Sequence, residues 1–169
     1  LKDCKQQISE NKRLGPNLYI PITIVGGDQE NWGNCFVINS EKEAVIAVRE
    51  AKKLNADFIK VFDLYDSLAF IALLKEARLN GISVAGHCPI AFNIANASES
   101  GMNCFEHLFG VELGASSLEA ELRKKLIKES QECKNSFQDL VRLLYFVQAP
   151  EMINSYDSIK AKQLFIKLK

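Results

Sequence analysis

Three side chains that can bind metal or carry protons recur at similar intervals along this 169-residue chain: Lys60, His87 and His107. The two histidines are the only ones in the sequence. Lys60 lies in the middle of the apolar run Ala56–Phe62, where a charged amine is costly to bury unless it is paired or chemically changed. Each has an ordinary explanation alone, as a hydrogen-bonded histidine or a lysine that reaches the surface. Their recurrence predicts one shared site.

Short strands must bring these side chains together. The runs Ala56–Phe62, Ile82–His87 and Met102–His107 each have the composition of a buried strand, and Leu18–Val25 predicts an earlier one. Pro21 makes that first strand irregular or places it at an edge of the sheet. We therefore expect about four strands.

Helical patterns fill the intervals between these strands. Ser40 with Glu43 is a capping box that begins one helix, and Asp66 or Ser67 begins another that Gly81 ends. Residues 29–39 are expected to form a loop. Strands that alternate with helices predict an α/β fold with a parallel sheet, in which the carboxyl ends of all strands lie on one face.

Strand alternation predicts which side chains share a face of the sheet. One parity carries Ile59, Val61, Ile82 and Val84, which suit packing against helices. The opposite parity carries the three chemically active residues, together with Phe58, Phe62, Ser83, Ala85, Asn103 and Phe105.

The character of the chain changes after residue 115. Ser116 with Glu119 is a second capping box, Asn135 can begin a further helix, and a last helix begins near Asp157. We predict two regions: a partial α/β barrel over residues 1–115 and a helical extension over residues 116–169 packed on it.

Composition excludes several classes of partner. The chain has 21 basic and 21 acidic residues, so it lacks the positive excess of a nucleic-acid-binding protein. No apolar run is long enough for a membrane helix, and the start lacks the pattern of a signal peptide.

The five cysteines are odd in number and contain no Cys-x-x-Cys pair, which favours a reducing compartment such as the cytoplasm. Because the chain begins with Leu1 instead of methionine, we expect an excised piece of a longer protein.

Residues 43–117 resemble the amidohydrolase superfamily, in particular its imidazolonepropionase-like and dipeptidase-like branch. The matching text is Ala47-Val48-Arg49-Glu50 before Ala56–Phe62, then Ile82–His87, then Ser100-Gly101 before Phe105-Glu106-His107. The combination of lysine, histidine and histidine on three successive strands carries the resemblance.

This resemblance implies a (β/α)8 barrel and metal-dependent hydrolysis of C–N bonds. The lysine corresponding to Lys60 would be carboxylated to a carbamate that bridges two divalent metals, with zinc expected, and His87 and His107 would bind the second ion. Such a family also uses a His-x-His pair on its first strand and an aspartate on its eighth. The sequence contains neither, so the chain is similar to family strands three to six alone.

The lack of these two family features determines which function we predict for this chain. We predict a fragment of a metal-dependent amidohydrolase that is inactive alone, with Lys60 an uncarboxylated amine and metal absent or only partly held. Its partners would be the remaining barrel strands and a small-molecule or dipeptide-like substrate. Exposed sheet edges predict self-association of the fragment, with Phe58, Phe62 and Phe105 as the contact residues, unless the C-terminal helices form a lid.

Two other interpretations remain open. The chain can be a non-catalytic α/β binding or scaffold module in which Lys60 is salt-bridged and His87 and His107 are structural. It can also be a small zinc protein that uses both histidines with Cys88 and Cys104, although these four side chains do not converge in regular strands.

Overall fold

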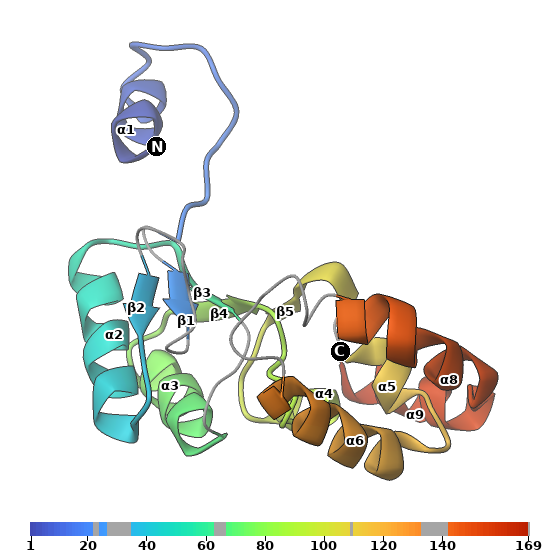
Figure 1. Cartoon of the computed structure of the whole chain (residues 1–169). Helices are drawn as coiled ribbons and strands as arrows, with labels where there is room; N and C mark the ends of the chain where they lie inside the picture. Colours follow the sequence, from blue (N-terminus) through green and yellow to red (C-terminus); the bar gives the residue numbers. More distant parts are fainter. Residues whose placement is uncertain (22–23, 27–34, 63–66, 109, 133–141, 169) are drawn as a thin grey trace.

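The computed structural model describes residues 1–21, 24–26, 35–62, 67–108, 110–132 and 142–168. Its centre is a five-stranded sheet in the order β2-β1-β3-β4-β5, and every neighbouring pair is parallel (Figure 1). The strands are β1 (Ile24–Gly26), β2 (Cys35–Val37), β3 (Phe58–Val61), β4 (Ser83–Gly86) and β5 (Cys104–Phe105). The predicted α/β class with a parallel sheet is confirmed, but the sheet has five strands and not four.

The additional strand, β2, lies inside the segment that we expected to be a loop. It pairs with β1 through Ile24 and Cys35, and Ile38 continues the contact by donating its N–H to the Gly26 carbonyl at 2.8 Å. The predicted strand Leu18–Val25 is also shorter than expected, because residues 18–21 form no strand. Pro21 has no N–H to donate to a neighbouring strand, which is consistent with this later start. Trp32 and Asp66 lie outside the described residues.

One face of the sheet packs on two helices, α2 (Glu41–Lys53) and α3 (Ser67–Leu79). Ile59, Val61 and Val84 are at most 1% exposed on this face, as their alternation predicts. On the opposite face Phe58 and Lys60 are half-buried and Ser83 is exposed.

A strand order of 2-1-3-4-5 also occurs in doubly wound folds, which carry helices on both faces of the sheet. Among the described residues, α2 and α3 instead lie side by side below the sheet (Figure 1). A sheet with helices on one face is consistent with part of a barrel wall, and the complete barrel remains a prediction.

Helix α2 begins where the sequence predicts a cap. Ser40 Oγ accepts the Glu43 N–H at 3.3 Å at the start of α2, and the Glu43 carboxylate accepts the Asn39 N–H at 2.8 Å. Asn93 caps the short helix α4 (Ile94–Glu99) by accepting the Ala95 N–H at 2.9 Å. The N-terminal helix α1 (Lys2–Ser9) is tied to the sheet by an ion pair between Lys5 and Asp57.

Beyond β5 the described chain is helical. The elements are η1 (Glu106–Leu108), α5 (Val111–Gly114), α6 (Glu119–Glu132), the π-helical η2 (Leu143–Gln148), α8 (Ala149–Asn154) and α9 (Ser158–Lys167). The start of the helix predicted from Asn135 lies outside the described residues.

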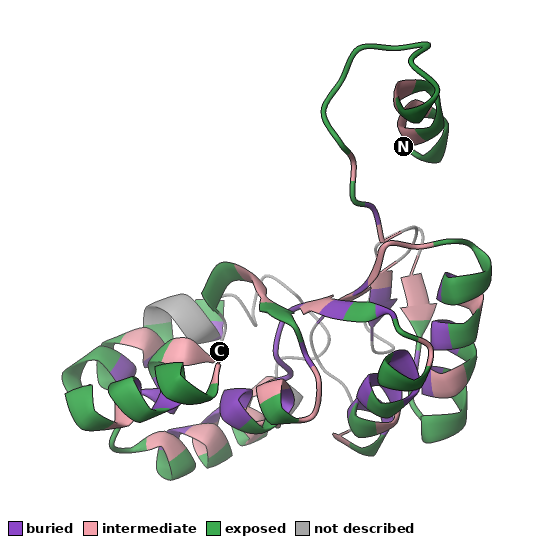
Figure 2. Ribbon diagram, turned by 180° about the vertical axis from the view of Figure 1, so that it is seen from behind, coloured by how far each residue is buried: buried purple, intermediate pink, exposed green. Residues whose placement is uncertain are grey.

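These helices contribute to two apolar cores. Figure 2 shows buried residues both around the sheet and among the C-terminal helices. A small core joins Leu113, Leu122, Leu126, Leu143 and Met152, whereas Leu164 of α9 belongs to the main core with the sheet. The division at residue 115 remains a prediction. No helix in the described part of the chain has the length and apolar character needed to cross a bilayer.

Candidate metal centre

The predicted site residues lie at the carboxyl edge of the sheet. Lys60 pairs in register with Ala85, and Gly86 pairs with Phe105 in the next strand. His87 therefore comes directly after β4, and His107 comes two residues after the end of β5. The expectation that both histidines are at the ends of neighbouring parallel strands agrees with this arrangement.

Gly86 determines how closely β3 and β4 approach before His87. Its φ is +134°, and a Cβ at this position would lie 2.1 Å from the Val61 carbonyl oxygen. The same carbonyl accepts the His87 N–H at 3.1 Å. Only glycine fits this contact without a backbone shift, so the contact fixes where the His87 side chain leaves the sheet.

His107 departs from the strand pattern. It lies in the short helix η1 with a φ of 56°, so alternation along β5 does not determine its direction. The alternation that predicts one face for Asn103, Phe105 and His107 therefore does not extend to His107. The Asn103 side chain instead accepts the Val84 N–H at 2.9 Å.

The two histidines nevertheless meet. Their ring centroids are 5.1 Å apart at an interplanar angle of 76°. His87 is only 3% exposed, and its ring also lies against Phe62, with a centroid separation of 4.6 Å. A buried ring held between two aromatic neighbours has a restricted orientation.

Glu106 completes the cluster, and no sequence pattern assigned it a role. His87, Glu106 and His107 each offer one ligand atom, and these three atoms all lie within 4.8 Å of one another. Two imidazoles and a carboxylate are a donor set that zinc, iron, cobalt and manganese all accept in proteins. The residues therefore fit a divalent ion.

Lys60 contacts the same carboxylate. Its Nζ forms an ion pair with Glu106, and its side chain is 16% exposed. This pairing explains physically how a charged amine is tolerated in an apolar strand. It is the salt bridge expected under the non-catalytic interpretation. In the sequence, a buried Lys60 ammonium requires an anionic partner, and this requirement could have identified Glu106.

Cys88 and Cys104 are not members of this ligand group. Within the described residues, Cys88 is buried with its Sγ 3.6 Å from the Phe92 carbonyl oxygen, and Cys104 is exposed. The group of potential ligands contains Glu106 in their place. This arrangement does not favour the zinc site of two histidines and two cysteines.

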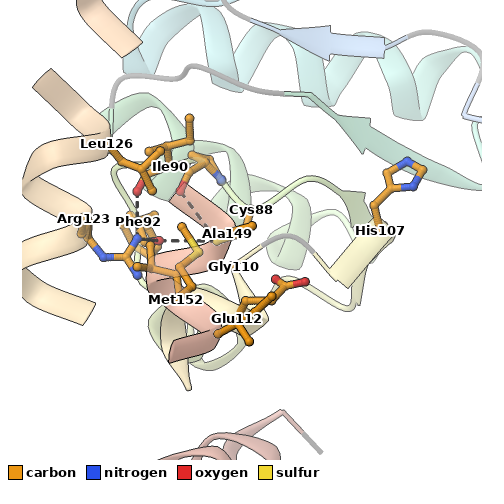
Figure 3. A pocket seen from close by; sticks show the side chains of 13 residues that line it. Cys88, Ile90, Phe92, His107, Gly110, Glu112, Arg123, Leu126, Ala149 and Met152 are labelled. Carbon is orange, nitrogen blue, oxygen red and sulfur yellow. Dashed lines mark hydrogen bonds between the residues drawn. The ribbon is translucent and has the colours of Figure 1, made fainter. Parts of the chain in front are cut away.

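An apolar cavity of about 250 Å³ borders the cluster. Its walls include Cys88, Phe92, Leu126 and Met152, with His107 at its edge and pointing away from the other labelled side chains (Figure 3). Arg123 also lines the cavity.

The Arg123 guanidinium is already used by the protein. It donates to the carbonyls of Ile90 at 2.8 Å and Phe92 at 2.7 Å, and to the Glu119 carboxylate at 2.8 Å. These bonds assign Arg123 to holding the loop after β4.

Comparison with known proteins gives a similarity in fold. No family model matches the chain, and no curated protein matches it. A solved structure of bottromycin amidohydrolase is similar to it with a TM-score of 0.59 and 24% sequence identity. The alignment covers 64% of this chain and 24% of that protein, so the aligned part of the chain spans about a quarter of its neighbour's length. The fold is thus of a kind found in an amidohydrolase.

Proposed function

We propose that this chain is part of a metal-dependent hydrolase of the amidohydrolase type, which cleaves amide or peptide-like C–N bonds with metal-activated water. The observation that carries the proposal is the convergence of His87, Glu106 and His107 at the carboxyl edge of a parallel sheet. In barrels built from such sheets, this edge carries the active site. The fold of the structural neighbour supports the same conclusion.

In the complete protein, His87, His107 and a carbamate of Lys60 would hold divalent metal, with zinc the expected ion. Bound metal supplies hydroxide near neutral pH and polarises the scissile carbonyl. The chain's own contribution is orientation. The Gly86 contact sets the exit of His87 from the sheet, and the Phe62 ring limits its rotation.

The isolated chain is proposed to be inactive. Its sequence contains no His-x-His pair, and its only two histidines already belong to the one cluster. The remaining barrel strands would supply further ligands and would be the partners of this chain. The proposed substrate is a small amide or a dipeptide-like molecule.

The test compares this chain with a longer protein encoded by the flanking sequence. Both are assayed for release of amine from a panel of amides and dipeptides, with and without added zinc. We expect metal-dependent hydrolysis by the longer protein only, and its loss in the His87→Asn and His107→Asn variants. Full-rate, metal-dependent turnover by the isolated chain contradicts the proposed inactivity. No hydrolysis by a metal-loaded longer protein contradicts the function.

The ion pair between Lys60 and Glu106 favours one alternative, a non-catalytic binding or scaffold module with Lys60, His87 and His107 as structural residues. Metal analysis separates the two functions. The hydrolase predicts two equivalents of metal in the longer protein, whereas the scaffold predicts none.

A further inference from the structure

We propose that this chain alone binds one divalent cation through His87, Glu106 and His107, and that Lys60 competes with that cation for the Glu106 carboxylate instead of serving as a ligand. The inference rests on the proposed function in one respect, the use of a divalent ion at the strand ends. It assigns a role to Glu106, and it reverses the role expected of Lys60.

The positions of the donor atoms carry the first step. All three lie within 4.8 Å of one another, whereas an ion bonded tetrahedrally at about 2.0–2.2 Å needs its donors about 3.3–3.6 Å apart, so at least one side chain must move inward. The His87 and Glu106 side chains differ in conformational freedom. His87 is 3% exposed and held by the Phe62 ring, whereas the Glu106 side chain is 33% exposed. Glu106 can therefore adjust to an ion that His87 positions.

The charges carry the second step. Glu106 is the carboxylate that pairs with the Lys60 ammonium, and it also belongs to the ligand group. An ammonium and a divalent cation repel each other across a few ångströms, and one carboxylate cannot fully neutralise both. Lys60 therefore weakens binding of the ion as long as its side chain stays protonated and uncarboxylated. Removing its charge should tighten binding.

A carbamate at Lys60 predicts the opposite. Carboxylation of the Lys60 ammonium joins its nitrogen to carbon dioxide with loss of two protons and creates an anionic ligand. Under that arrangement, replacement of Lys60 removes a ligand and weakens binding, and added bicarbonate strengthens it. The sign of a single substitution thus distinguishes the two roles of Lys60.

The experiment titrates the 169-residue chain with Zn²⁺ by calorimetry and with Co²⁺ by visible absorption, in buffer purged of carbon dioxide and again with bicarbonate. We expect one equivalent of either ion, with affinities that bicarbonate changes by less than twofold. We expect Lys60→Met to bind at least tenfold more tightly, and Glu106→Gln and His107→Asn to bind at least tenfold more weakly.

A matched control is Lys125→Met, because Lys125 is also ion-paired to a glutamate but lies on α6 opposite Glu151 of α8. Its affinity should equal that of the unsubstituted chain within twofold. Circular dichroism checks the folding of each variant. If Lys60→Met does not fold, Lys60→Gln and the bicarbonate comparison on the unsubstituted chain test the same role.

Three outcomes overturn the inference: no binding of either ion, weaker binding by Lys60→Met, or binding that bicarbonate strengthens. None of them decides the proposed function, which is tested by hydrolysis in the longer protein. The last two would in fact support a carbamate at Lys60. Failure of hydrolysis in the longer protein, with Lys60→Met binding more tightly here, would contradict the function and leave this site intact.

Discussion

At the scale of single residues, the position of His87 depends on its neighbour Gly86. Lys60, His87 and His107 could be located from the sequence, because each stands out by type and each follows or lies in a strand-like run. Glu106 could not be assigned in the same way, since a glutamate is ordinary at a surface. Its contacts arise from η1, where His107 has a φ of 56°, and no periodicity predicts such a turn.

Gly86→Ala should destabilise the fold strongly. A Cβ would meet the Val61 carbonyl oxygen at 2.1 Å, and φ of +134° adds backbone strain, so we expect a loss of about 3 kcal/mol or more in the free energy of unfolding. Gly81→Ala is the matched control, because Gly81 also has a positive φ but nothing lies within 4 Å of its added Cβ. Its cost should be about 1–2 kcal/mol. Urea unfolding measures both, and equal losses would contradict the role of the contact.

At the scale of elements, the carboxylate of Glu119 joins three helices. It accepts hydrogen bonds from Arg123 on its own helix α6 and from Lys160 on α9, each at 2.8 Å, and from Asn93 at the start of α4. The sequence predicted Ser116 and Glu119 as a capping box. The Ser116 hydroxyl accepts the Leu118 N–H at 3.0 Å just before α6. The Glu119 side chain binds Arg123, Lys160 and Asn93 instead of completing the predicted capping box.

Helix starts and the buried sheet parity were predictable because they depend on local spacing. The strand β2 was not, because three residues carry too little pattern and its place is set by pairing with β1.

Glu119→Gln should lower stability in a pH-dependent way. Burial, the largest influence, raises the pKa of Glu119, but hydrogen bonds from Lys160 and Arg123 together hold the pKa below its ordinary value of 4.5. The charged carboxylate therefore stabilises the fold above about pH 4.5, and this contribution is lost as the pH falls through the lower pKa of the folded state. At pH 7 we expect the variant to lose roughly 1–3 kcal/mol, with water screening part of the bond to the half-exposed Lys160.

Denaturant unfolding at pH 7, 5 and 3 checks this prediction. The stability difference between the two proteins should shrink towards pH 3. Glu151→Gln, which removes a pair on an exposed surface, should change stability little at any of these values. A difference that stays constant with pH would show that the charge of Glu119 is not the cause.

At the scale of the whole molecule, the sheet leaves one face without helices in the part of the chain that the structure describes. The α/β class was predictable because alternating strand and helix patterns leave few other arrangements. The residues expected on the open face have different surroundings. Phe62 is buried beside His87 and Phe105 packs partly on the main core, whereas Phe58 stays half-buried next to the exposed Ser83.

We therefore expect self-association through this face and the sheet edges. Light scattering after size-exclusion chromatography should show a mass that rises with protein concentration. Phe58→Asp should reduce the association, whereas Leu14→Asp should not, because Leu14 is fully exposed in the segment after α1. A monodisperse monomer over the whole concentration range would contradict the prediction and favour the C-terminal helices as a lid.

The proposed function and the further inference both require a divalent-metal site formed by the side chains at the strand ends. Anomalous diffraction at the zinc edge from zinc-soaked crystals of this chain tests that requirement most directly. We expect a peak at about 2.0–2.1 Å from a ring nitrogen of both His87 and His107, with the Glu106 carboxylate turned towards it. The absence of a peak at this edge of the sheet, with Lys60 and Glu106 still paired, would contradict that expectation.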